Sequence, residues 1–231
     1  MLGQAFARGF QQLLEPSLRG VLVKAIGLAA VLYLVLAIGA ATLASGYEAD
    51  WLQSHEWLAW VAQALVSLLS ILLLLLLFPT LVTAFLGLYL DTVAGAVERR
   101  HYPAEPPGRK LPAGQALLHG MRFLAVALTL NLLALPFYVT AFWLPMVNFV
   151  VLYGLNGYLL GREYYELVSF RHLPPVAAGV LRRRRRRWPM FLAGVVIAVL
   201  LTVPLLNLAA PVVAAAAMVH VFKHMQAARH A

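Results

Sequence analysis

The chain has 231 residues, of which 62% are hydrophobic and 12% are charged. Soluble globular domains are about half apolar and about a quarter charged. This composition therefore excludes a soluble globular domain and indicates a membrane protein. The formal net charge of +9 lies mostly between apolar stretches, as is typical of faces that touch the cytoplasm and its anionic lipids. The absence of cysteine excludes disulfides, thiolate metal sites and cysteine nucleophiles.

Residues 1–15 carry the first pattern along the chain. Leu2, Phe6, Phe10 and Leu13 recur at helical spacing, and polar side chains fall mostly on the other faces. This pattern predicts an amphipathic helix that lies in the membrane interface.

Long apolar stretches follow, and the charges between them predict the topology. The segment 45–56 has no basic residue and carries three acidic ones, whereas five basic residues lie in 91–122 and eight in 161–187. The positive-inside rule therefore places 45–56 outside and the other connections, with both termini, in the cytoplasm. Residues 17–44 and 57–90 are predicted to span the membrane as a first and a second transmembrane helix.

The apolar stretches 123–160 and 188–222 must each enter the membrane and return, because basic segments flank both. Two prolines in the interior of each stretch, Pro136 with Pro145 and Pro204 with Pro211, interrupt the helical hydrogen bonding. The arms left between them are shorter than the roughly 20 residues of a full crossing. We therefore expect two re-entrant, half-membrane helical hairpins, with four complete crossings as the alternative. The predicted fold is one all-α integral membrane domain over 1–231.

Two connections complete this plan, a cytoplasmic one at 91–122 and a basic, interfacial one at 161–187. The second contains the run Arg182–Arg187, which leads directly into an apolar arm. In that position the run is expected to fix orientation and to bind anionic lipids, and nucleic-acid binding is not expected.

Polar residues in and beside the hairpins are candidates for a pathway. Arg162 and Glu166 stand four residues apart and can pair on one helical face, with Glu163 beside them. They are interpreted as a gate at the cytoplasmic end or, alternatively, as an ion pair that fixes the hairpin. Asn148 and Asn207 either line a path or form hydrogen bonds between helices.

The combination of the amphipathic start, the segment Pro16–Gly20, the hairpins and the block from Asn156 to Leu167 resembles the CysZ family of bacterial sulfate permeases. The resemblance covers nearly the whole chain. It implies an inner-membrane protein that assembles as an oligomer and admits sulfate for cysteine synthesis. It also implies two spanning helices and two half-membrane hairpins.

The resemblance also implies a sulfate-binding site at the start of the first spanning helix. The family has a Gly-Leu-Arg-Arg motif there, and the matching positions in this chain are Ser17, Leu18, Arg19 and Gly20. The first amides of a helix and an arginine suit an oxyanion. Gly20 replaces the second arginine, and Glu15 would repel an anion unless an arginine neutralises it. The alternative is a helix cap, with Arg19 reaching lipid headgroups.

The expected function is therefore sulfate uptake by channel-like or proton-coupled passage, with Glu163, Glu166 and His220 as candidate proton carriers. No cofactor or metal is expected. The chain has no His-Glu-x-x-His, Gly-x-Ser-x-Gly or Walker motif, so an enzyme is not expected. The competing hypothesis is a non-transporting membrane scaffold that organises lipids or partner proteins.

Overall fold

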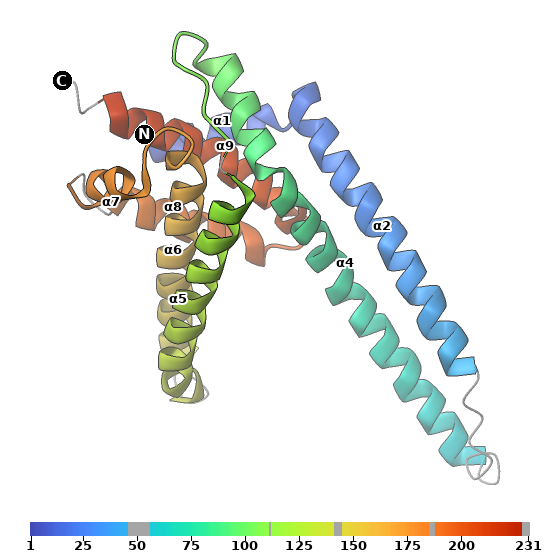
Figure 1. Ribbon diagram of the computed structural model, residues 1–231. Coiled ribbons are helices and arrows are strands. Elements are labelled where there is room, and N and C mark those ends of the chain that lie inside the picture. Colours follow the sequence, from blue (N-terminus) through green and yellow to red (C-terminus); the bar gives the residue numbers. More distant parts are fainter. Residues whose placement is uncertain (46–55, 111, 141–144, 185–187, 228–231) are drawn as a thin grey trace. The chain divides into compact units, whose positions relative to one another are not determined.

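The computed structural model describes residues 1–231 except 46–55, 111, 141–144, 185–187 and 228–231 (Figure 1). Regular secondary structure in the described residues is entirely α-helical, which confirms the all-α fold class. The helices are α1 (Leu2–Gln12), α2 (Pro16–Ser45), α4 (Glu56–His101), α5 (Ala113–Thr140), α6 (Pro145–Ser169), α7 (Pro175–Arg184), α8 (Trp188–Thr202) and α9 (Leu206–Ala227).

The chain forms two compact units. Residues Val21–Leu88 form one, called here the span unit, and Met1–Gly20 with Tyr89–Ala231 form the other, called the bundle unit. Both α2 and α4 contribute to each unit, because the division falls inside these two helices.

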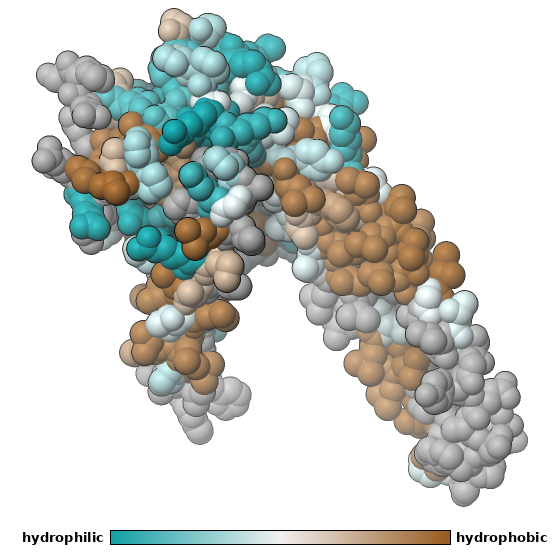
Figure 2. Space-filling model, in the orientation of Figure 1, coloured by the Kyte–Doolittle hydropathy of each residue, from teal (hydrophilic) through white to brown (hydrophobic). Residues whose placement is uncertain are grey.

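The span unit contains most of α2 and the first part of α4, the two stretches that the sequence predicts to cross the membrane. The rings of Tyr33 and Phe78 meet edge to face, with centroids 5.8 Å apart, and join the two helices. Apolar side chains cover the outside of these helices (Figure 2). On α2, for example, Val31, Leu34 and Val35 are each more than half exposed. Such surface is expected where lipid is the solvent.

The bundle unit is built around α9. Every residue from Ala210 to Lys223 is buried, because α1, α6 and α8 all pack against this helix. The run Ala214–Ala217 lets neighbouring backbones come close. α1 uses this freedom, since a Cβ added at Gly9 would lie 3.0 Å from the carbonyl oxygen of Val213. The helix predicted within 1–15 thus turns its buried face to α9, and its place in the membrane interface stays a prediction.

The crossing of α6 and α8 is even tighter and depends on glycine. A Cβ added at Gly194 would overlap the carbonyl oxygen of Gly157, and one at Gly161 would overlap that of Met190. Gly157 and Gly161 stand four residues apart and form the small-residue pattern by which membrane helices approach closely. The sequence contains this pattern, but its partner Gly194 could not be read from it.

The prediction that all four hairpin prolines interrupt their helices is wrong for Pro136 and Pro211. These residues lie inside α5 and α9, respectively. A proline removes one helical hydrogen bond, and a helix tolerates the loss where neighbouring groups surround the backbone, as they do around the buried Pro211. Pro136 is exposed, and nothing in the structure explains why α5 continues through it. Pro145 begins α6, where a proline costs little, and Pro204 lies in the turn that precedes α9. Leu205 completes that turn with a φ of 67°.

Each predicted hairpin corresponds to two consecutive helices in contact, α5 with α6 and α8 with α9. α8, Trp188–Thr202, is shorter than a full crossing, whereas α5 runs over 28 residues, so the prediction of a short arm that ends before Pro136 is wrong. α9 is long and apolar enough to cross, as are Pro16–Gly39 and Leu77–His101. Helix length therefore leaves the depth of the hairpins a prediction.

Candidate functional site

The predicted sulfate-binding residues lie in the first turn of α2. Ser17 and Arg19 are exposed, whereas the Leu18 side chain is buried. The amides of Leu18 and Arg19 donate to the carbonyl oxygen of Glu15, at 3.1 and 2.9 Å, so these two donors are already occupied. What this turn offers an anion is the Arg19 guanidinium, the polar groups of Ser17 and the positive end of the helix dipole.

The carboxylate of Glu15, beside this turn, forms an ion pair with Arg100 from the end of α4 and also lies near His101. Arg100 Nε lies 3.2 Å from Glu15 Oε1, and His101 Nε2 lies 3.5 Å from the same oxygen. From the sequence, an anion near Arg19 requires that another arginine offset the charge of Glu15. Arg100 meets this condition. A hollow of about 420 Å³ lies beside Glu15, and Arg8 also lines it.

A second group of charges surrounds Glu166 on α6. The sequence predicts that this end of the helix faces the cytoplasm. Arg162 Nε donates to Glu166 Oε1 at 2.7 Å, which confirms the pair expected from the four-residue spacing. Arg182 Nη1, from α7, lies 3.3 Å from the same oxygen. The hydroxyl of Tyr165 donates to the carbonyl of Ala178 at 2.9 Å and ties α7 to α6.

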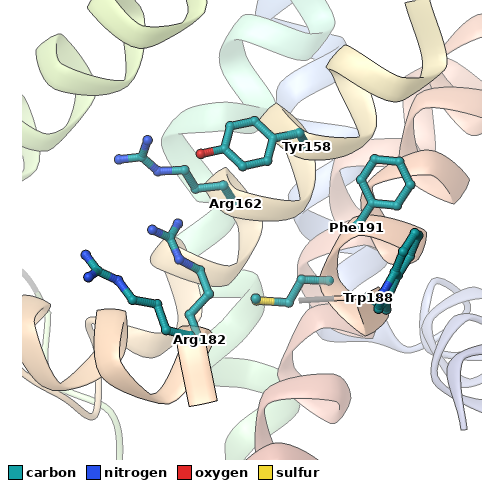
Figure 3. A pocket seen from close by; sticks show the side chains of 7 residues that line it. Tyr158, Arg162, Arg182, Trp188 and Phe191 are labelled. Carbon is teal, nitrogen blue, oxygen red and sulfur yellow. The ribbon is translucent and has the colours of Figure 1, made fainter. Parts of the chain in front are cut away.

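These contacts position a cavity between α6, α7 and α8, called here the arginine cavity. It has a volume of about 600 Å³. Its lining residues are Tyr158, Arg162, Arg182, Arg183, Trp188, Met190 and Phe191. Figure 3 shows the labelled arginines on one side of the cavity and the rings of Trp188 and Phe191 on the other.

A neighbouring hollow of about 350 Å³ shares three of these arginines and adds Arg122 from α5. Among the residues that line the two hollows, Glu166 is the only carboxylate. Glu163 is exposed and lines neither. The wall therefore carries an excess of positive charge, which can attract an anion.

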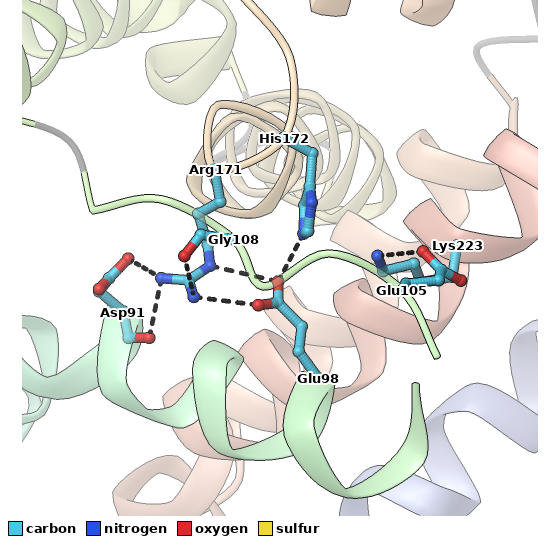
Figure 4. A network of polar contacts seen from close by, with 7 residues as sticks. All are labelled: Asp91, Glu98, Glu105, Gly108, Arg171, His172 and Lys223. Carbon is cyan, nitrogen blue, oxygen red and sulfur yellow. Dashed lines mark hydrogen bonds and ion pairs between the residues drawn. The ribbon is translucent and has the colours of Figure 1, made fainter. Parts of the chain in front are cut away.

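A third charged group is buried and is called here the buried arginine network (Figure 4). Arg171 donates to both carboxylate oxygens of Glu98, at 3.2 and 3.0 Å, to the carboxylate of Asp91, and to the carbonyl of Gly108 at 3.4 Å. His172 Nε2 lies 2.8 Å from Glu98 Oε1. Burial alone lowers the pKa of Arg171, but its bonds to Glu98 and Asp91 outweigh this effect and raise it.

This network ties α4, the loop after it and the segment after α6 together, and it was not among the contacts predicted from the sequence. Arg171 is 73 residues from Glu98 and 80 from Asp91, so no local spacing indicates either pair. The only available signal is that Glu98 and Asp91 are acidic residues on a helix with long apolar stretches.

Asn148 and Asn207, the two candidates from the sequence, and two further asparagines of the apolar helices have different surroundings. Asn148 is exposed near the start of α6, and Asn207 Oδ1 is buried with no hydrogen-bond partner in the described residues. The side chains of Asn131 and Asn156 donate to carbonyls four residues earlier in their own helices, both at 2.8 Å. The bonds that these last two side chains make in the described residues thus lie within their own helices.

The predicted residues do not form one site. No hydrogen bond or ion pair among the described residues joins the first turn of α2 to Arg162 or Glu166. Three arginines of the run Arg182–Arg187, residues 185–187, lie outside the described residues. Within the described residues, no cluster of three or more histidine, aspartate or glutamate side chains could hold a metal ion.

The family model described as sulfate transporter CysZ/etoposide-induced protein 2.4 matches residues 5–211. The chain belongs to this family. The match includes the first turn of α2 and the whole arginine cavity. Together with the helices long enough to cross a membrane, family membership makes the chain a multi-pass membrane protein of a transporter family. No curated protein matches the sequence.

Proposed function

We propose that this chain is an inner-membrane permease that admits sulfate for cysteine biosynthesis. The observation that carries this proposal is the match of the sulfate transporter family over residues 5–211. The apolar span unit and the positive charge on the bundle unit support it, because a dianion needs both a route through lipid and positive groups that attract it.

The first turn of α2 is the proposed entry site for sulfate. Arg19 is exposed, and no ion pair to it occurs in the described residues, so its guanidinium is available to an oxyanion. Arg100 already binds Glu15, which lessens the repulsion from that carboxylate. Because the amides of Leu18 and Arg19 are already hydrogen-bonded, sulfate is proposed to bind mainly to the Arg19 side chain.

Passage is proposed to be channel-like. Bringing a dianion into a cell costs about 4.6 kcal/mol per 100 mV, which coupled protons could offset. His220 is a poor carrier for them, because it is buried and holds Gln12 and Tyr102 at 2.9 and 2.8 Å through its two ring nitrogens. Sulfate consumption inside the cell can instead draw the flux.

The membrane plan completes this proposal. The short helix α8, Trp188–Thr202, supports a half-membrane second hairpin. The proposal places Arg162, Glu163 and Glu166 at the cytoplasmic end of the route. Both termini are cytoplasmic, and the chain assembles as a homo-oligomer. Since the chain has no cysteine, a single cysteine at Asn207 reports its own accessibility. Labelling only from the periplasm would contradict the half-membrane depth.

Radiolabelled sulfate uptake into proteoliposomes tests transport. Arg19→Ala removes the exposed guanidinium and should reduce uptake about tenfold, the loss expected for one hydrogen-bonded charge. Arg99→Ala is the matched control, because Arg99 is also an exposed arginine but lies on α4. Uptake by the wild type at the level of empty liposomes would contradict the proposal and favour the scaffold hypothesis. Equal uptake by Arg19→Ala and wild type would remove the α2 turn as the site.

A further inference from the structure

The arginine cavity has two chemically different walls, which together fit one kind of molecule. We propose that it binds the phosphate headgroup of an acidic phospholipid, with the acyl chain leaving along α8. This inference deepens the proposed contact between the basic segment and anionic lipids, and so rests on the membrane setting, but it does not depend on sulfate flux.

The basic wall has donors to spare for a phosphate. Arg162 and Arg182 direct one donor each to a single oxygen of Glu166, and a guanidinium carries five. Arg183 is exposed and has no ion pair in the described residues. A phosphate diester on this wall would therefore gain charge-assisted bonds without displacing Glu166.

The opposite wall is apolar and aromatic. Trp188, Met190 and Phe191 line it, and a tryptophan at this level is typical of the membrane–water interface. A cavity of about 600 Å³ is of the size that holds an organic ligand. A bare sulfate or phosphate would leave this wall uncovered, whereas the glycerol and first acyl carbons of a lipid would cover it.

An apolar stripe continues from the cavity along α8. Trp188, Leu192, Val196 and Val199 are 67%, 45%, 38% and 43% exposed and recur at intervals of three or four residues, which places them on one face of the helix. The stripe starts at the cavity and follows the arm predicted to enter the membrane. An acyl chain lying on it would keep its headgroup at the arginines.

Native mass spectrometry of the purified full chain, in a detergent that preserves bound lipid, tests the site. Phosphatidylglycerol should be retained in preference to phosphatidylcholine with the same acyl chains. Each arginine lost should weaken retention roughly fivefold, from about 1 kcal/mol per basic residue. Arg183→Gln should thus lose roughly fivefold and R182Q/R183Q roughly thirtyfold. Arg183→Lys keeps the charge and should retain the lipid.

Arg109→Gln is the matched control, since Arg109 is exposed on the loop after α4 and only its backbone amide makes a described bond. It should retain phosphatidylglycerol as the wild type does. Arg183→Gln guards against misfolding, because Arg183 has no described ion pair to break. Phosphatidylglycerol brominated on its acyl chains should also quench tryptophan fluorescence, and Trp188→Phe should remove most of that quenching.

Three results would overturn the assignment. Equal retention of the two lipids would do so, as would equal losses in R182Q/R183Q and Arg109→Gln. The third is saturable binding of sulfate or inorganic phosphate to lipid-depleted protein, abolished in R182Q/R183Q, when the wild type shows no lipid preference. The ligand of the cavity would then be a free oxyanion. Sulfate uptake that persists without lipid preference would refute this inference alone, and lipid preference without uptake would refute only the transport proposal.

Discussion

The buried arginine network and the arginine cavity use the same chemistry for different ends. In the network, Arg171 and Glu98 are both buried, and their charged atoms meet one another, Asp91 and His172. On the wall of the cavity, Arg162 and Arg182 share the carboxylate of Glu166, and Arg183 has no ion pair in the described residues. Charge that is fully paired inside a protein holds elements in place, whereas unbalanced charge on a cavity wall is available to a ligand.

This difference predicts that the two regions respond in opposite ways to loss of charge. Removing one partner from the network leaves a buried charge without compensation, so the loss falls on stability. Removing an arginine from the cavity leaves no such charge stranded, so the loss falls on binding. Thermal unfolding and lipid retention of the same variants separate the two effects.

The largest effect on stability is expected for Arg171→Ala. It leaves the carboxylate of Glu98, which is only 4% exposed, with His172 as its remaining described partner, and it removes the side-chain bonds that join α4 and the loop after it to the segment after α6. The expected cost is about 3–5 kcal/mol, and poor recovery of folded protein would accompany it. Thermal melting in detergent, monitored by circular dichroism, measures it. Arg109 is an exposed arginine of the same loop, so Arg109→Ala should have the melting temperature of the wild type. Equal melting temperatures for Arg171→Ala and Arg109→Ala would contradict a structural role for the network.

A smaller loss is expected for Gly108→Ala, which leaves every charge of the network in place. A Cβ at this position would lie 2.8 Å from Arg171 Nε and 2.9 Å from Glu98 Oε2, so these atoms must shift. Overpacking of this kind typically costs about 1–3 kcal/mol. Gly114→Ala is the control, because nothing lies within 4 Å of its added Cβ. A melting temperature for Gly108→Ala as high as that of Gly114→Ala would mean that the loop gives way without disturbing the bonds.

The comparison also separates what the sequence could predict from what it could not. Apolar length and the placement of charge predicted the helical membrane plan, because both are local properties of the chain. The pair of Arg162 and Glu166 followed from spacing on one helix. Arg171 with Glu98 did not, since folding alone brings together residues so distant in the sequence. The arginine cavity could not be predicted from the sequence for the same reason, because α6, α7 and α8 each supply only part of its wall.

The prolines show a second limit of sequence reasoning. The cost of a proline inside a helix depends on what surrounds the freed backbone, and the sequence of the helix does not contain that information. Pro211 is buried, as are Ala210 before it and the residues that follow it to Lys223, and the helix continues through it. Pro145 was read correctly as a boundary because the first turn of a helix needs no amide from it.

The smallest effect on stability, and the sharpest contrast, is expected for Glu166→Gln. Glu166 is about one-fifth exposed and partly solvated, so the loss of its ion pairs should cost less than about 1 kcal/mol, in contrast to the buried carboxylate of Glu98. The same change frees Arg162 and Arg182 for a phosphate, so retention of phosphatidylglycerol should rise about fivefold. Native mass spectrometry and thermal melting, read on one preparation, would show binding gained where stability is slightly lost. A large fall in melting temperature with no gain in lipid would instead make Glu166 a structural residue like Glu98, and the two regions would no longer differ in kind.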